Sequence, residues 1–349
     1  MNSFKVNYIT TLPKEGNAPS VTISGDLHKT YRVEFHERGV GLISSGHCMT
    51  NQTIICSTKQ WYTNWEINVI DENNKVVFID KFNPSNQVIF IKIDAYALGD
   101  NIAWMPYVEW FRKKHNCKVI CSTFYNDLFV DTYPQIMFVK PNTVINNVYA
   151  QYYIGASDDN NKTYSPVNSK EVNLQQVASS ILGLPFEELR PELYHDFSKS
   201  RRIFGQKYVT LSEFGSGENK SWKANGGWQK IVDYLNMVGL TVVVISKEPT
   251  TLKNVINHTG NYDLKDRMYE IYHAEFHLGV SSGLSWLAWA MGKHVVMVSD
   301  VTPKWHEFQS DVSRLCANNL DMVDYDAEGV STPEEVIGKL AELIVSRYL

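Results

Sequence analysis

The sequence lacks long apolar runs, a secretory leader and internal repeats. No run approaches the roughly 20 apolar residues that cross a bilayer. The stretch from Met1 to Tyr8 lacks the apolar core and the small-residue cleavage site of a signal peptide. We therefore expect a cytoplasmic protein, and the 349 residues are enough for two or three domains.

Cysteine is scarce, and its spacing argues against zinc. The chain has five cysteines, an odd number, and none of them follows the spacing of a zinc site. Reduced thiols are the preferred interpretation. The alternative is that Cys117 and Cys121 form half of a metal site, but the sequence otherwise predicts no metal.

An excess of positive charge is also missing. Lys and Arg total 33 against 38 Asp and Glu, so the formal net charge is −5. This balance gives no general footprint for nucleic acid. Two local basic clusters remain, Arg112–His115 and the group of Lys199, Arg201 and Arg202. We interpret both as solvated surface, with phosphate contact by the second group as the alternative.

Strand and helix patterns divide the chain into three predicted units. Residues 1–85 alternate short strands with polar turns, which predicts a small antiparallel β domain. Residues 86–202 and 203–349 each alternate strands with helices, which predicts two doubly wound α/β halves with parallel sheets. Helices are expected at Leu128–Tyr133 and Leu252–His258, among others. The polar segment Tyr153–Val172 is long enough to be a functional loop.

One strand runs directly into a helix at Gly99 and Asp100. The β-branched run Val88–Ile93 ends shortly before them, and an amphipathic helix follows. Ligands of open α/β sheets bind at such carboxyl ends of strands. Gly99 would allow a sharp turn, and the charge of Asp100 would suit the helix N-terminus. Asp100 is a candidate general base. The alternative is that it merely caps the helix.

A second turn of this kind lies late in the chain. The strand Phe276–Val280 ends in a loop of small residues, and an apolar helix follows. Small hydroxyl residues and a glycine before a helix N-terminus form a site for phosphate or diphosphate. The alternative is a tight turn whose serines only cap the helix. The loop residues are Ser281, Ser282, Gly283, Leu284 and Ser285.

Three stretches in this order resemble a known family. They are ALGDNIAWMPYVEWFRKKHNCKV (97–119), KSWKANGGWQKIVDYL (220–235) and GVSSGLSWLAWAM (279–291). Together they resemble the ADP-heptose glycosyltransferases, and within them the bacterial autotransporter heptosyltransferases. The likeness extends more loosely from about residue 20 to 310. It implies a GT-B fold with two Rossmann-like halves, which here would follow the small β domain.

The resemblance also implies roles for individual residues. Asp100 matches the catalytic aspartate of the family, Lys220 the lysine that contacts the donor phosphates, and Glu248 a glutamate that recognises the nucleoside. Many members have Asp-Thr where this chain has Ser281 and Ser282, so we expect phosphate contacts through backbone N–H groups. From pattern alone, Lys220 and Glu248 could equally be solvated loop residues.

One departure limits what the resemblance implies. Family members carry a C-terminal cysteine cluster that binds iron and supports a large ring, whereas this chain has only Cys316 in that region. We therefore expect neither iron nor the ring, and we expect the protein to be a monomer or a dimer. The expected co-substrate is a nucleotide-diphosphate sugar, ADP-heptose by analogy or a UDP-sugar, with no other cofactor.

The sequence leaves the acceptor open. The first hypothesis is an inverting transfer of heptose to hydroxyls of a protein such as an autotransporter adhesin. The alternative is a bacteriophage enzyme that glycosylates a hydroxymethylated DNA base, or a sugar already on it, in the cytoplasm of an infected host. A third, non-catalytic sugar- or nucleotide-binding module is disfavoured because Asp100, Lys220 and the Ser-Gly-Leu loop are all retained.

Overall fold

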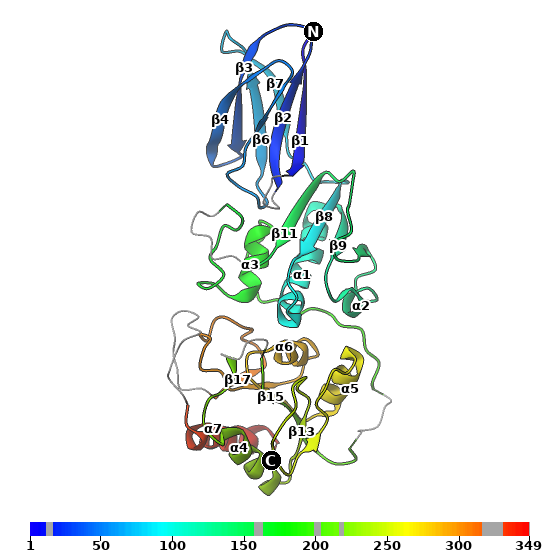
Figure 1. The fold of residues 1–349 in the computed structure, drawn as a ribbon, viewed down its shortest axis with the longest axis vertical. Helices are drawn as coiled ribbons and strands as arrows, with labels where there is room; N and C mark the ends of the chain where they lie inside the picture. The colour runs from blue at the N-terminus through cyan, green and yellow to red at the C-terminus, as the bar shows by residue number, and fades with distance from the viewer. Residues whose placement is uncertain (12–16, 157–162, 199–203, 216–219, 316–330, 349) are drawn as a thin grey trace.

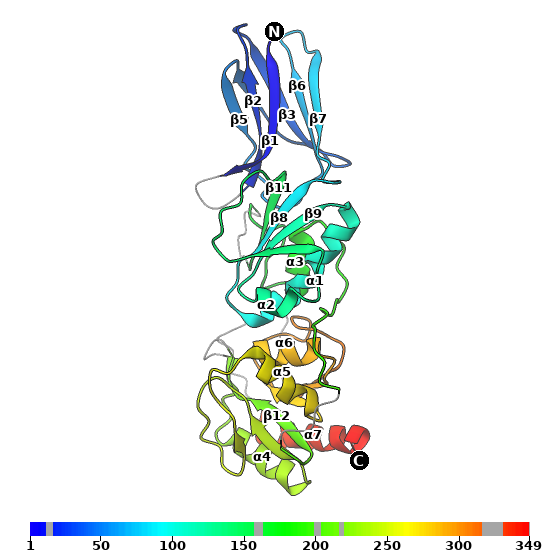
Figure 2. The same ribbon diagram turned by 90° about the vertical axis from the view of Figure 1, so that its right-hand side faces the viewer.

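The computed structural model describes residues 1–11, 17–156, 163–198, 204–215, 220–315 and 331–348. Figures 1 and 2 show three units stacked along the long axis, with the N-terminus at one end and the C-terminus in the unit at the other. The middle and last units each contain a parallel sheet, and the first is antiparallel. The predicted fold class is confirmed in these features.

The first unit packs two antiparallel sheets face to face. One has the order β1-β2-β5 and the other β4-β3-β6-β7. Every second side chain of β3 is buried, among them Val33 and Phe35, because one face of the sheet covers the core. Sequence patterns indicated four of these seven strands and missed β1, β2 and β4. The strands are β1 (Ser3–Thr11), β2 (Asn17–Ser24), β3 (Thr30–Glu37), β4 (Gly41–Met49), β5 (Gln52–Ile55), β6 (Trp65–Ile70) and β7 (Val76–Lys81).

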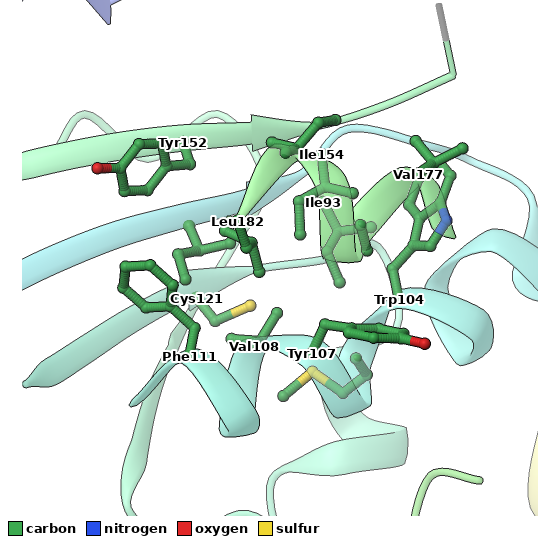
Figure 3. Close-up of a cluster of buried hydrophobic side chains, with 14 of the residues drawn as sticks. Ile93, Trp104, Tyr107, Val108, Phe111, Cys121, Tyr152, Ile154, Val177 and Leu182 are labelled. Atoms are coloured by element: carbon green, nitrogen blue, oxygen red, sulfur yellow. The ribbon is translucent and has the colours of Figure 1, made fainter. Parts of the chain in front are cut away.

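The middle unit has a four-stranded parallel sheet of order β10-β9-β8-β11. Helix α1 (Leu98–His115) packs against β8 and β9 and also against α3 (Leu174–Ile181). Figure 3 shows the resulting core, in which Tyr107, Val108 and Phe111 of α1 meet side chains of the sheet and of α3. The other elements are β8 (Val88–Ile93), β9 (Lys118–Ser122), α2 (Asn126–Phe129), β10 (Ile136–Val139) and β11 (Ala150–Ile154).

The last unit has a six-stranded parallel sheet of order β14-β13-β12-β15-β16-β17. Helices α4 and α7 share one hydrophobic core with the sheet, whereas α5 and α6 belong to the core that continues into the middle unit. The elements are β12 (Tyr208–Ser212), α4 (Gly227–Met237), β13 (Thr241–Val244), β14 (Ile256–Asn257), α5 (Leu264–His273), β15 (His277–Gly279), α6 (Gly283–Ala290), β16 (Val295–Met297), β17 (Val312–Arg314) and α7 (Pro333–Tyr348).

Two predicted helices are corrected. The segment Leu252–His258 is not helical: Ile256 pairs with Val243 of β13, and Asn254 adopts a φ of 60°. Its helix-like apolar spacing instead reflects packing of a loop beside α4. The predicted helix Leu128–Tyr133 is the single turn of α2, shifted toward the N-terminus. Pro134 disfavours the helical conformation of Tyr133, the residue before it.

None of the helices in the described ranges is long and apolar enough to cross a membrane. The longest helix that the structure describes, α1, carries Asp100 in its first turn and four basic residues in its last turn. Its charges follow the helix dipole, with the acidic group at the N-terminus and the basic groups at the C-terminus. The cluster Arg112–His115 forms that last turn. Lys113 and Lys114 are exposed as predicted. His115 instead packs against Phe111 and Tyr62, and burial lowers its pKa to about 4.

Candidate functional site

A cavity of about 380 Å³ lies where the middle and last units meet. The N-termini of α1 and α6 both reach it, since each helix follows the carboxyl end of a parallel strand. Figure 1 shows α6 facing the middle unit. The lining residues are Ala97, Gly99, Asp100, Ala156, Ser169, Lys170, Leu174, Lys220, Ser281, Ser282, Gly283, Trp286 and His306. Residues from six separate segments of the chain therefore converge here.

Two glycines allow the helices to approach closely. A Cβ atom on Gly99 would lie 2.8 Å from Cδ1 of Trp286, and one on Gly283 would lie 2.8 Å from Cβ of Leu98. Gly99 lies in the first turn of α1 and does not have a positive φ. The predicted sharp turn at Gly99 is therefore wrong, and the close approach of Trp286 explains why this position needs a glycine.

Asp100 lies in the first helical turn and faces the cavity. The N-cap residue of α1 is Ala97, which makes no side-chain capping bond, so the interpretation of Asp100 as the cap is wrong. Burial raises the pKa of Asp100 to about 6, an effect partly opposed by the charge of Lys220. A carboxylate with a pKa just below neutrality is ionised at pH 7 and still basic enough to accept a proton.

Asn101 fixes the loop that leads to Asp100. Its side chain is fully buried and donates hydrogen bonds to the carbonyl oxygens of Ala95 and Ala97, both at 2.8 Å. The backbone before the helix is thereby held in one conformation. Sequence reasoning missed this role because asparagine beside Asp100 was equally compatible with solvent exposure.

Lys220 reaches the cavity from the last unit. Burial lowers the pKa of its ammonium group, and the nearby charge of Asp100 opposes that shift. A Cβ atom on Gly215 would lie 3.1 Å from the Lys220 side chain and 3.2 Å from the carbonyl oxygen of Ser281. Gly215 therefore leaves room for the lysine beside the Ser281 loop. The carboxylate of Asp100 and the ammonium group of Lys220 are therefore close enough for each charge to affect the pKa of the other group.

The hydroxyl groups of the serine loop bond within the protein. Ser282 is the N-cap of α6 and accepts a bond from the N–H of Ser285 at 3.4 Å. The hydroxyl of Ser285 donates to the carbonyl of Val280 at 2.7 Å, and that of Ser281 donates to Glu307 at 2.5 Å. The first N–H groups of a helix have no intrahelical acceptor, so at Gly283 the backbone is the natural anion ligand. Leu284 and Ser285 do not line the cavity.

Glu307 and Arg314 support this loop from behind. Glu307 is fully buried, and its second carboxylate oxygen forms an ion pair with Arg314 of β17. A buried carboxylate that is bonded on both oxygens holds its partners firmly. These two residues escaped the sequence analysis because they lie far along the chain from Ser281.

His306 is a further lining residue that the sequence did not indicate. Burial lowers its pKa to about 4, with contributions from the charges of Lys220 and Arg314. The imidazole is therefore neutral at pH 7. In the sequence, no metal spacing or motif distinguishes His306 from the other histidines. Ser169 and Lys170, by contrast, come from the polar segment predicted to be functional.

The structure does not bring four further predicted residues to the cavity, and it describes only one of them. Glu248 is exposed on the loop after β13 and does not line the cavity, so its role toward a nucleoside stays a prediction. Lys199, Arg201 and Arg202 lie outside the described residues, and their contact with phosphate is likewise untested.

The interpretation of Cys117 and Cys121 as half of a metal site finds no support. Cys121 is fully buried in the core of Figure 3, and burial raises the pKa of both thiols, that of Cys117 to about 11. Thiols bind metal as thiolates, which this environment disfavours. Within the described ranges, no three His, Cys, Asp or Glu side chains come together as metal ligands, and Cys316 lies outside those ranges.

Sequence comparison finds autotransporter heptosyltransferases. The chain is 32% identical over 295 residues to the autotransporter heptosyltransferase Aah of Escherichia coli, covering 78% of this chain and 74% of Aah. It is 29% identical over 276 residues to TibC of E. coli O78:H11, covering 75% and 67%. An inactive relative, BimC of Burkholderia thailandensis, is 27% identical over 315 residues, covering 85% and 74%. No family model matches the chain.

Solved structures give the same fold. The iron-containing dodecameric glycosyltransferase TibC from enterotoxigenic E. coli superposes with a TM-score of 0.82 at 21% identity, covering 97% of this chain and 98% of TibC. The E. coli ADP-heptose lipopolysaccharide heptosyltransferase II superposes with a TM-score of 0.55 at 12% identity, covering 75% of this chain and all of that protein. The predicted GT-B fold is confirmed. Because the described residues offer no ligand cluster, we derive no step through iron.

Proposed function

Because the chain belongs to the autotransporter heptosyltransferases and is a glycosyltransferase, we propose that it transfers heptose from ADP-heptose to protein hydroxyls with inversion. The observation that carries this proposal is the cavity in which Asp100, Lys220 and the Ser281–Gly283 loop face one another. The donor is supported by TibC, which has been solved in complex with ADP-D-β-D-heptose.

Asp100 acts as the base in this proposal. Its carboxylate takes the proton of the acceptor hydroxyl while the oxygen attacks the anomeric carbon of the sugar. The bond between that carbon and the diphosphate oxygen breaks, and ADP leaves with the bonding electrons. Negative charge grows on the diphosphate during this step. In this proposal the Lys220 ammonium group and the N–H groups at the start of α6, which line the same cavity, stabilise that charge.

The relatives' names support an autotransporter as the acceptor. We propose an adhesin of this kind, modified at its serine or threonine hydroxyls. No observation on the described residues favours hydroxymethylated DNA. The basic residues that would contact its phosphates, Lys199, Arg201 and Arg202, lie outside those residues.

The transfer itself can be measured by intact-mass spectrometry. We expect the purified protein, incubated with ADP-heptose and a co-expressed adhesin passenger fragment, to add the mass of one heptose residue or several. UDP-glucose replaces ADP-heptose as the control donor. A mass gain on hydroxymethylated duplex DNA, with none on the protein, would contradict the proposal and favour the DNA acceptor.

The pH dependence of transfer should report the ionisation of Asp100. Because its pKa is raised to about 6, the base is protonated below that pH, and kcat/KM should fall about tenfold per pH unit there. Above pH 7 the rate should be flat. If His306 were the base instead, the fall in kcat/KM would begin near pH 4, because burial lowers the pKa of His306 to about 4. Calorimetric titration of the donor at pH 5 and pH 8 separates loss of catalysis from loss of binding.

A further inference from the structure

A second cavity, of about 340 Å³, lies beside the candidate site. It is formed by the loop and turn after β9 in the middle unit and by the start of α5 in the last unit. Figure 1 shows α2 and α5 on the same side of the junction between these units. The lining residues are Phe124, Tyr125, Asp127, Leu128, Asp131, Tyr194, Asp263, Leu264, Lys265 and Met268.

Aromatic side chains connect this cavity to the loop that carries Asp100. The hydroxyl of Tyr125 donates a hydrogen bond to the carbonyl oxygen of Tyr96 at 2.9 Å. Phe124 packs against the Tyr96 ring with the ring centroids 4.0 Å apart. Burial raises the pKa of Tyr125, and the nearby charge of Asp100 raises it further. The second cavity therefore opens next to the candidate base, where an acceptor must approach.

The exposed surface of this cavity is aromatic and acidic. Tyr194 is 68% exposed, and Tyr96 at its edge is 79% exposed. Asp127, Asp131 and Asp263 line the cavity together with one lysine, Lys265, and no ion pair within the described ranges involves these three carboxylates. Asp263 also caps α5, since its carboxylate accepts a hydrogen bond from the backbone N–H of Lys265 at 2.8 Å. Aromatic faces and carboxylates both attract cations, the former through the ring quadrupole.

We propose that this cavity binds a lysine- or arginine-bearing segment of the acceptor protein and so selects hydroxyls that have a cationic residue nearby. This inference rests on the proposed function, because it names the chemistry of the acceptor for the same site. The negative charge of the cavity favours a cationic peptide over DNA as the acceptor. A cationic peptide segment gains from the three carboxylates, whereas the phosphates of DNA would be repelled by them.

The test compares two fluorescein-labelled peptides that share one serine in a Gly/Asn background. One carries two lysines near the serine, and the other carries two glutamates at the same positions. Binding is measured by fluorescence anisotropy in the presence of ADP, which requires no turnover. We expect the lysine peptide to bind at least about tenfold more tightly. The double variant Asp127→Asn/Asp131→Asn should lose about tenfold of that affinity, since one exposed charge pair contributes roughly a factor of two to five.

Asp266→Asn is the matched control, because Asp266 is exposed on α5 but does not line the cavity. It removes one negative charge from the surface, against two in the double variant, and should leave peptide affinity unchanged. Similar affinities for both peptides, including no binding by either, would overturn the inference, as would an equal effect of Asp266→Asn. Calorimetry with ADP-heptose reports on the donor separately, so failure of the proposed function would appear there and not in the peptide comparison.

Discussion

Asp100→Asn is expected to lower the rate of heptose transfer by at least about 100-fold while the protein stays folded and binds the donor normally. A general base contributes about 10²- to 10⁴-fold, and an amide cannot take the proton of the acceptor hydroxyl. The fold should tolerate the change because burial already disfavours the charge of Asp100, as its raised pKa shows. Transfer is measured under donor and acceptor saturation.

The control for this variant is Asp94→Asn. Asp94 is exposed in the same loop and forms a surface ion pair with Lys92 at 2.9 Å. Losing such a pair costs little, so this variant should transfer heptose at a nearly normal rate. If Asp100→Asn also retains a nearly normal rate, Asp100 is not the base and the mechanism fails.

Lys220→Ala has the second-largest expected effect, and it concerns donor binding. We expect the affinity for ADP to fall about 10- to 100-fold, which is the range for loss of a hydrogen bond to a charged group. The affinity for adenosine should change less than about twofold, because adenosine carries no phosphate for an ammonium group to contact. Isothermal titration calorimetry with both ligands measures the difference.

Lys223→Ala provides the matched control. Lys223 is an exposed lysine shortly after Lys220 and does not line the cavity, so its removal should leave both affinities unchanged. Equal losses for ADP and adenosine in Lys220→Ala would place this lysine away from the phosphates.

The elements that carry the site could be predicted from local patterns. The β-branched run that ends before Gly99 and the small-residue loop at Ser281 both mark strands that lead directly into helices, and the structure has these as β8–α1 and β15–α6. Periodicity detects such units because each buries one continuous face. In the first unit, strands such as β4 escaped prediction. Its side chains are mostly exposed, so Gly41–Met49 shows little apolar alternation.

Contacts between distant segments could not be predicted. His306 reaches the cavity, and Glu307 reaches Ser281, only because the turn after β16 folds back toward the serine loop, and no local pattern encodes that return. The steric requirement for a glycine at position 99 could not be predicted either, since the Trp286 ring that occupies the space beside Gly99 lies in the other half of the molecule. Sequence suggested a turn because glycine more often serves conformation than close approach.

Transfer rate and donor affinity, measured on the same preparations of Asp100→Asn and Lys220→Ala, test the central claim most directly. In the proposed mechanism, Asp100 on one side of the cavity serves the chemistry and Lys220 on the other serves donor binding. We expect Asp100→Asn to lose rate at unchanged affinity for ADP-heptose, and Lys220→Ala to lose affinity for ADP-heptose. If both variants lose affinity equally, or if Asp100→Asn alone loses it, the division of roles within this cavity is contradicted.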